Sequence, residues 1–198
     1  MKCDIVLAGV GGQGILSIAT VLGYAAVENN LYLKQAETHG MSQRGGAVQS
    51  YLRLSDRPIH SDLIPSGGAQ LILAVEPLES LRYLTFLSPD GYVVTNTTPF
   101  VNIPDYPEPE QVLENLRQLP RVVAIDAESV AKNEGNAKAS NMVMLGAASP
   151  LIDLPLESLE QGIREIFSRK GKEIVELNLR AFHAGRAFAE QILNGKKK

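Results

Sequence analysis

The sequence predicts an α/β fold, with an open, mostly parallel sheet, helices on both of its faces and a helical C-terminal part. Short apolar runs alternate with segments of helical period from Asp4 to Ala127. A glycine cluster separates the first apolar run from the first helical segment, and no strand-like run follows Glu128. A strand, a glycine turn and a helix at the start of such an alternation indicate a Rossmann-like sheet.

Local signals place the elements in chain order. Apolar runs bounded by turn residues predict strands, and segments of helical period predict helices. Pro77 suits a first helical turn, and Ser88–Gly91 predicts the turn that ends the helix. The expected strands cover residues 4–8, 31–36, 47–54, 71–75, 92–96 and 121–127, with a further extended piece beginning at 59–61. The expected helices cover residues 15–29, 77–87, 110–119, 141–148, 156–169 and 172–193.

Length, charge and cysteine content limit the classes to which the protein can belong. A chain of 198 residues suits one α/β domain, which we place at residues 1–195, followed by a basic tail at 196–198. The net charge of -3 disfavours capture of nucleic acid, and the first apolar run is too short for a membrane span or a signal peptide. Cys3 is the single cysteine, so the chain cannot supply the several thiolates of an iron–sulfur cluster. We expect a cytoplasmic protein.

The most distinct short pattern is G-x-G-x-x-G, placed directly after a strand and directly before a helix. It is formed by Gly9, Gly11 and Gly14, with Gly12 and Gln13 between them. Such a turn can bring the backbone close to a phosphate at a helix N-terminus, or it can serve only to connect strand and helix. The pattern alone leaves both interpretations open.

A polar, glycine-punctuated stretch at residues 37–46 predicts a structured loop. Glu37 stands where a dinucleotide-binding fold places the acidic residue that bonds a ribose hydroxyl. The guanidinium of Arg44 can hold a carboxylate or a phosphate through two bonds, and Gly45 allows a close approach of backbone or ligand. The candidate ligand-binding residues of this stretch are Glu37, Ser42, Gln43, Arg44 and Gly45.

Other reactive side chains form no recognisable catalytic pattern. His39, His60 and His183 lack metal-ligand spacing, and a hydrogen-bonded structural role is favoured for each. No serine stands in a G-x-S-x-G turn, and no Lys-Ser or Lys-Thr pair follows the glycines. We assign no catalytic residue and no metal site.

Three segments together resemble the gamma-type domain of 2-oxoacid:ferredoxin oxidoreductases, over nearly the whole chain. They are residues 6–16 around the glycine turn, the stretch 37–46, and Asn141-Met142-Val143-Met144-Leu145-Gly146. The stretch 37–46 is the most specific of the three, because it matches at ten consecutive positions. Pyruvate-type members carry different residues before the Arg-Gly-Gly, so the resemblance favours the arylpyruvate branch, the beta subunit of indolepyruvate ferredoxin oxidoreductase.

This resemblance implies a subunit that is inactive alone. It implies a large alpha subunit that carries thiamine diphosphate, magnesium and 4Fe–4S clusters, with coenzyme A as co-substrate and ferredoxin as electron acceptor of the complex. The implied reaction is oxidative decarboxylation of a 2-oxoacid to an acyl-CoA. For the isolated chain a homodimer is left open, and neither nucleic acid nor membrane is an expected partner.

Two other classes of function remain open on the sequence alone. A free-standing NAD(P)- or FAD-dependent oxidoreductase would use the glycine turn and Glu37 in a dinucleotide site. A regulatory or scaffolding protein would keep the fold without the enzyme.

Overall fold

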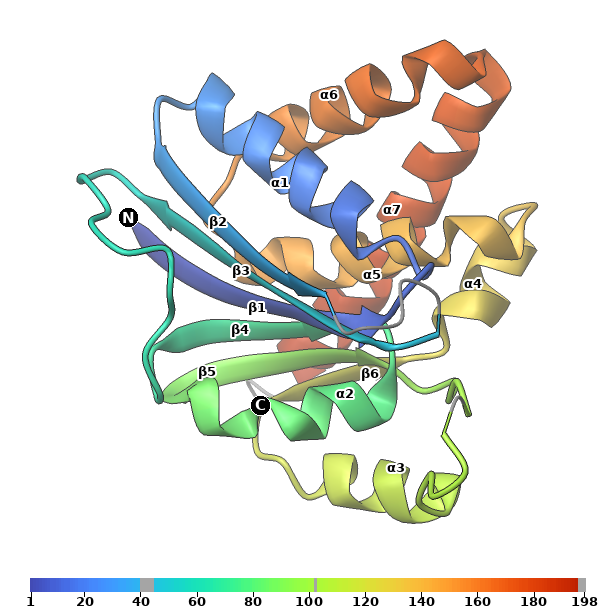
Figure 1. The fold of residues 1–198 in the computed structure, drawn as a ribbon. Coiled ribbons are helices and arrows are strands. Elements are labelled where there is room, and N and C mark those ends of the chain that lie inside the picture. Colours follow the sequence, from blue (N-terminus) through green and yellow to red (C-terminus); the bar gives the residue numbers. More distant parts are fainter. Residues whose placement is uncertain (40–44, 102, 196–198) are drawn as a thin grey trace.

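The computed structural model describes residues 1–39, 45–101 and 103–195, and only the backbone of His39. Within these residues the chain forms one six-stranded sheet in the order β2-β3-β1-β4-β5-β6 (Figure 1). The strands are β1 Lys2–Val10, β2 Tyr32–His39, β3 Ala47–Ser55, β4 Ala69–Ala74, β5 Leu87–Asn96 and β6 Val122–Ile125. β1, β4, β5 and β6 are parallel, and β3 is antiparallel to its two neighbours. The predicted open, mostly parallel sheet is confirmed.

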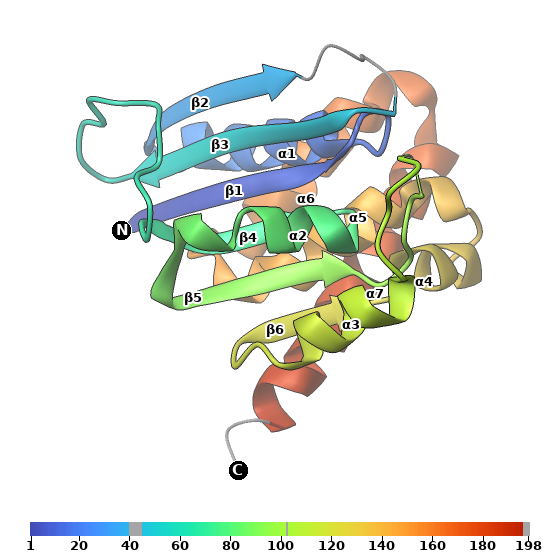
Figure 2. The same cartoon turned by 60° about the horizontal axis from the view of Figure 1, so that its bottom comes forward.

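Helices cover both faces of the sheet, as predicted. α2 and α3 lie on one face, and α1, α5, α6 and α7 lie on the other (Figure 2). The helices are α1 Ile15–Glu28, α2 Pro77–Arg82, α3 Pro109–Arg117, α4 Ala127–Asn133, α5 Ser140–Ala148, α6 Leu156–Phe167 and α7 Lys172–Gly195. Short 3-10 helices occupy Leu84–Phe86, Ala137–Ala139, Ser149–Leu151 and Ser168–Lys170. No helix of the described residues is both long and apolar enough to cross a membrane.

β3 lies between the first two strands of the chain. β1 and β2 run in the same direction, but each pairs antiparallel with β3 and not with the other. The strand–helix–strand unit at the N-terminus is therefore split by a later strand. β1 is buried from Cys3 to Val10, because it has sheet neighbours on both sides and helices on both faces.

The first three residues of the stretch 37–46, which was expected to be a loop, are strand. Glu37, Thr38 and His39 belong to β2, where they pair with Ser50, Gln49 and Val48. β2 is the edge strand and most of its residues are partly or fully exposed, so polar side chains reach water there while the backbone ladder continues.

Two further local predictions were wrong, and one helix was missed. Ser88–Gly91 is not a turn but part of β5, where the register shifts between Ala69 and Leu71 of β4. Such a bulge accommodates turn-forming residues inside a strand. No strand forms at 59–61, and α4 was not predicted, although Asp126 caps it by accepting a hydrogen bond from the Ser129 N–H.

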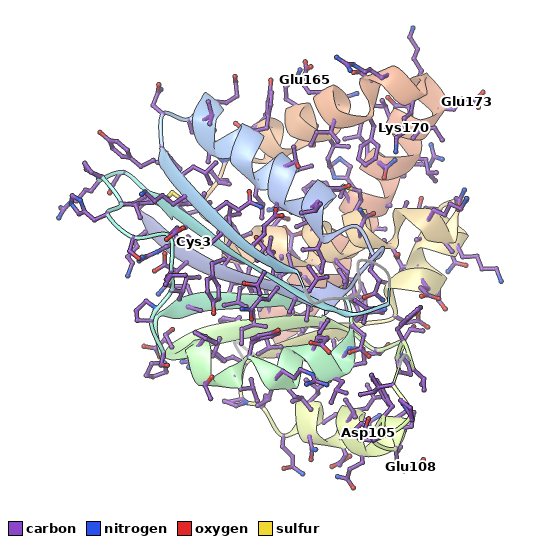
Figure 3. The ribbon with its side chains drawn as sticks, in the orientation of Figure 1. Cys3, Asp105, Glu108, Glu165, Lys170 and Glu173 are labelled. Carbon is purple, nitrogen blue, oxygen red and sulfur yellow. The ribbon has the colours of Figure 1, made fainter. Side chains whose placement is uncertain are left out.

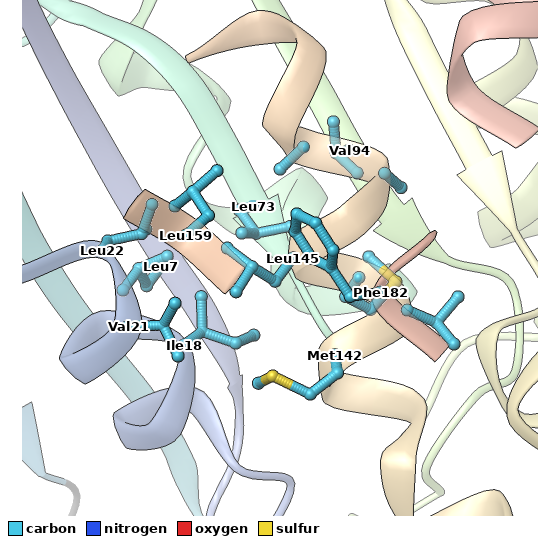
Figure 4. Close-up of a cluster of buried hydrophobic side chains, with 14 of the residues drawn as sticks. Leu7, Ile18, Val21, Leu22, Leu73, Val94, Met142, Leu145, Leu159 and Phe182 are labelled. Atoms are coloured by element: carbon cyan, nitrogen blue, oxygen red, sulfur yellow. The ribbon is translucent and has the colours of Figure 1, made fainter. Parts of the chain in front are cut away.

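The larger core lies between the sheet and the helices α1, α5, α6 and α7 (Figure 4). α5 is buried at every position from Asn141 to Ala148, as expected for a helix enclosed on all sides. Two glycines allow it to cross α7 closely. A Cβ atom at Gly146 would lie 1.9 Å from the Phe182 carbonyl oxygen, and one at Gly185 would lie 2.0 Å from the Val143 carbonyl oxygen.

We predict that Gly146→Ala destabilises the protein by about 3 kcal/mol, because the added methyl group meets a backbone carbonyl that cannot turn aside. Urea denaturation of the purified variant measures the effect as a lower midpoint with an unchanged slope.

Gly195→Ala is the matched control, since a Cβ atom there would meet nothing within 4 Å. Equal midpoints for the two alanine variants would show that the α5–α7 crossing is not limited by these glycines.

Candidate functional site

The glycine turn joins β1 to α1, and hydrogen bonds between Val10 and Gln13 close it. The Val10 N–H donates to Oε1 of Gln13 at 2.8 Å, and the Gln13 N–H donates to the Val10 carbonyl oxygen at 3.2 Å. At Gly9 a Cβ atom would lie 2.3 Å from Cγ2 of Val75, so only glycine lets β1 pass the residue that follows β4. The amide oxygen of Gln13 is thus part of the turn itself.

Gly12 and Gly14 adopt positive φ angles of 101° and 83°. Gly14 opens α1 without any side-chain cap. Asn141 of α5 packs against it, and a Cβ atom at Gly14 would lie 2.5 Å from Nδ2 of Asn141. The same Nδ2 donates to the Gly14 carbonyl oxygen at 3.3 Å.

The end of the 37–46 stretch lies against this turn. The Gly11 N–H donates to the Gly46 carbonyl oxygen at 2.9 Å, and the Gly45 N–H donates to the Gly11 carbonyl oxygen at 3.4 Å. These bonds continue the β1–β3 ladder beyond its last pair, Val10 with Ala47. Gly45 has a φ of 79°, a conformation that favours glycine. The three segments that carry the family resemblance therefore meet at one place.

A cavity of about 280 Å³ opens at this junction. Its lining combines glycine backbone with apolar side chains, namely Val10, Gly11, Gly12, Gly14, Ile15, Leu16 and Val48. The first turn of α1 leaves backbone N–H groups, including those of Ile15 and Leu16, without acceptors inside the helix, and the helix dipole makes this end positive. The cavity can therefore take a ligand with an anionic or carbonyl group on one side and an apolar part on the other.

Glu37 lies apart from the glycine turn. It sits on the edge strand, and its Oε1 accepts from Nε2 of Gln35, which also donates to Ser50 at 3.3 Å. β3 separates its strand from β1, which puts two strand spacings, about 10 Å, between their backbones. In a dinucleotide site the acidic residue follows a strand directly beside the first one. This geometry does not reproduce such a site.

The remaining predicted residues are placed as follows. Ser42, Gln43 and Arg44 lie outside the described residues, so their ligand role stays a prediction. His60 is exposed, and Nε2 of His183 lies 3.2 Å from Oε1 of Glu160. Across the ranges that the structure describes, no three His, Cys, Asp or Glu side chains gather as a metal site.

Cys3 is buried near the start of β1, with 5% of its surface exposed. Burial, together with the negative charges of Asp4 and Asp153, raises the pKa of its thiol to about 12. The thiolate is the reactive form of cysteine, so this side chain behaves as a small apolar core residue.

Sequence reasoning missed the apolar wall of the cavity. Leu16 is 50% exposed although it is large and apolar, and Val48 reaches the site only through the β1–β3 register. A leucine just after G-x-G-x-x-G, at the open end of a helix, was the signal available for Leu16. Nothing in the sequence indicated that β3 lies beside β1.

Solved structures define the class of this fold. It superimposes on the gamma subunit of a keto/oxoacid ferredoxin oxidoreductase from Geobacter sulfurreducens with a TM-score of 0.71 and 24% identity, over 96% of this chain and 99% of that one. It also superimposes on a 2-oxoglutarate:ferredoxin oxidoreductase from Magnetococcus marinus with a TM-score of 0.77 and 24% identity. There the match covers 96% of this chain but only 31% of the other, so this fold is one part of a longer polypeptide.

The chain belongs to the pyruvate ferredoxin/flavodoxin oxidoreductase family, whose model matches residues 4–188. It is 38% identical to the indolepyruvate oxidoreductase subunit IorB of Archaeoglobus fulgidus over 93% of this chain and 94% of that subunit. It is 36% identical to IorB of Pyrococcus horikoshii, over 96% and 98%. The common gamma subunit of the pyruvate/ketoisovalerate oxidoreductases of Pyrococcus abyssi is 29% identical, over 90% and 92%. The resemblance read from the sequence is confirmed.

We predict that Gly14→Ala destabilises the protein more than Gly12→Ala does. Both variants strain a positive φ, at about 1 kcal/mol each, but only the first drives a methyl group into Asn141. Urea denaturation of both variants measures the difference.

A double-mutant cycle isolates the clash. Asn141→Ala in the Gly14→Ala background should recover part of the lost stability, whereas in the Gly12→Ala background it should recover none. Identical behaviour in the two backgrounds would mean that Asn141 does not limit the turn.

Proposed function

We propose that this chain is the small, cluster-free subunit of a thiamine-dependent 2-oxoacid:ferredoxin oxidoreductase that acts on an arylpyruvate, with indolepyruvate favoured. A single gamma-type domain at residues 1–195 carries this role. The identity to two IorB subunits, 38% and 36% over nearly their full lengths, supports this branch, because the pyruvate/ketoisovalerate gamma subunits of Pyrococcus abyssi and Pyrococcus furiosus are 29% and 30% identical. The reaction is oxidative decarboxylation to an acyl-CoA, with electrons passed to ferredoxin by the complex.

The division of labour follows from the side chains that this subunit offers. Its single cysteine is buried and its thiol pKa is raised, so the 4Fe–4S clusters belong to a large partner subunit. The same partner binds thiamine diphosphate and magnesium, and the thiamine supplies the electron sink for decarboxylation. This chain contributes a preformed wall to the active site and is inactive alone.

The observation that carries the proposal is the meeting of the three resembling segments at the glycine turn. Gly11 is bonded to Gly45 and Gly46, and Asn141 closes on Gly14. The cavity there lies at the carboxyl ends of the parallel strands, where open α/β sheets bind ligands. We infer that this edge faces the partner's cofactor chamber or the channel for coenzyme A, with the α1 N-terminus available to an anionic group. We propose that Gly11, Gly12, Gly14 and Gly45 face the ligand, together with Ser42, Gln43 and Arg44. Gly9, Gln13 and Glu37, which the sequence also suggested, are left out because their contacts lie within the fold.

A dinucleotide-binding enzyme is the weaker alternative, since β3 holds Glu37 two strands away from the glycine turn. Calorimetry of the isolated chain with NAD, NADP and FAD separates the two proposals. Tight binding of any of them would favour the alternative.

Reconstitution tests the function. Co-expression with the thiamine- and cluster-bearing large subunit of the same organism should give a complex that reduces ferredoxin with indolepyruvate and coenzyme A. The isolated chain should show no turnover with the same substrates, because it offers no electron carrier.

A keto-acid oxidising activity of the isolated chain would contradict the proposal. A reconstituted complex that used pyruvate but no arylpyruvate would leave the class of enzyme intact and overturn the substrate.

Two variants of the complex test the site. Arg44→Ala removes a charged hydrogen-bond donor. Leu16→Trp places a larger side chain in the cavity lining, at a position where the native leucine is half-exposed. Each should raise the KM for coenzyme A about tenfold, the loss expected for one charge-assisted hydrogen bond or an equal steric cost. Steady-state kinetics at varied coenzyme A measures this.

Arg57→Ala and Val27→Trp are the matched controls, since both residues are exposed and lie outside the cavity lining. Wild-type turnover and coenzyme A dependence in Arg44→Ala and Leu16→Trp would make the turn and its loop purely structural.

A further inference from the structure

The connection from β5 to α3 forms a strap, which we define as residues 97–101 and 103–108. In Figure 2 it rises beside α2 and α3 at one end of the sheet. It follows a parallel strand, so it leaves the sheet at the same edge as the glycine turn. None of its residues belongs to the site proposed above.

Glu76, which follows β4, forms hydrogen bonds with two residues of the strap. Its Oε1 accepts from the Tyr106 hydroxyl and, at 3.3 Å, from the Phe100 N–H. Its Oε2 accepts from the Glu79 N–H at 2.9 Å, which caps α2. The side chain is buried, with 1% of its surface exposed, so these bonds replace water around a carboxylate. The same contacts raise the pKa of Tyr106, through burial first and the bond to Glu76 second.

The ends of β5 and β6 hold the first residues of the strap. The buried Asn96 donates through Nδ2 to the Thr98 carbonyl oxygen at 3.4 Å, and its Oδ1 accepts from the Ala127 N–H at 3.1 Å. The Thr98 hydroxyl donates to Oδ1 of Asp126 at 3.2 Å. Polar side chains at the ends of three neighbouring strands therefore hold the same loop.

The strap displays two adjacent apolar side chains. Phe100 is 47% exposed and Val101 is 64% exposed, and they are two of the six large, exposed hydrophobic residues in the described ranges. An aromatic side chain on a loop that is already held in place loses little entropy on binding, which is the property of an interface anchor.

The strap and the helix α3 that follows it are acidic in sequence. Residues 97–116 contain no lysine or arginine. Glu110 and Glu114 pair with Arg117, but Asp105 and Glu108, at the periphery of the molecule, have no ion-pair partner among the described residues (Figure 3). The complementary surface is an apolar socket with a basic rim. An anionic membrane or a nucleic acid would be repelled.

We propose that the strap is the docking surface for the large partner subunit, whose apolar socket with a basic rim receives Phe100 and Val101. This inference rests on the proposed function. One large partner that covers the carboxyl edge of the sheet meets both the cavity and the strap, whereas a smaller partner would reach only one of them.

The test measures the affinity between the purified chain and the purified large subunit. The double variant Phe100→Ser, Val101→Ser should raise the Kd about 30-fold, the loss expected for one anchor residue. The double variant Val27→Ser, Leu63→Ser removes residues that are 63% and 59% exposed at the opposite end of the strands, and it should leave the Kd unchanged. Wild-type affinity should also fall with added salt, because the rim contact is electrostatic.

Tyr106→Phe tests the anchoring without changing the exposed surface. It removes the bond to Glu76, so amide hydrogen exchange at 98–106 should speed up and the affinity should fall by less than in the double variant.

Each other outcome counts against the inference. If the large subunit binds the wild type and both double variants equally, the strap is not the docking surface, and the proposed function stands. If the large subunit does not bind the wild type at all, both proposals fail. If sedimentation shows that the chain dimerises and only the Phe100→Ser, Val101→Ser variant stays monomeric, the socket belongs to a second copy.

Discussion

The antiparallel pairing of β3 with β1 is the constraint on which the rest of the structure depends. It places a later strand inside the first strand–helix–strand unit and moves β2 to the edge of the sheet. It also carries Gly45 and Gly46 to the backbone of Gly11, because the ladder continues past its last regular pair. Val48 of β3 adds to the apolar lining of the cavity at the glycine turn, beside Ile15 and Leu16 of α1.

The two proposed surfaces use the same edge of the sheet in different ways. At the glycine turn the backbone itself is presented, and the side chains that surround it are small or apolar. At the strap, buried polar side chains hold a loop that exposes Phe100 and Val101. In these proposals, ligand binding by backbone N–H groups and association with the partner use separate parts of the same edge of the sheet.

The sequence predicted the strands and helices that depend on a local pattern of apolar residues. It did not predict the features that depend on the order of strands in the sheet. The parallel strands, α1 and the long C-terminal helices follow from runs of apolar residues, and the glycine turn follows from its spacing. The position of β3 does not follow from the sequence, because the residue pattern of a strand does not indicate which strand lies beside it. The conformation of the strap was not predicted, because Glu76 and Asp126, which help to hold it, are distant from it in sequence. The bulge at Ser88–Gly91 carried turn residues into a strand.

The burial of Cys3 has a practical consequence. With its thiol pKa near 12, the native chain presents no thiolate at neutral pH, and it has no second cysteine. A cysteine introduced at any exposed position would therefore be the one site open to a maleimide dye or spin label. Distances and mobilities within an assembled enzyme could then be read from this subunit without first removing a native residue.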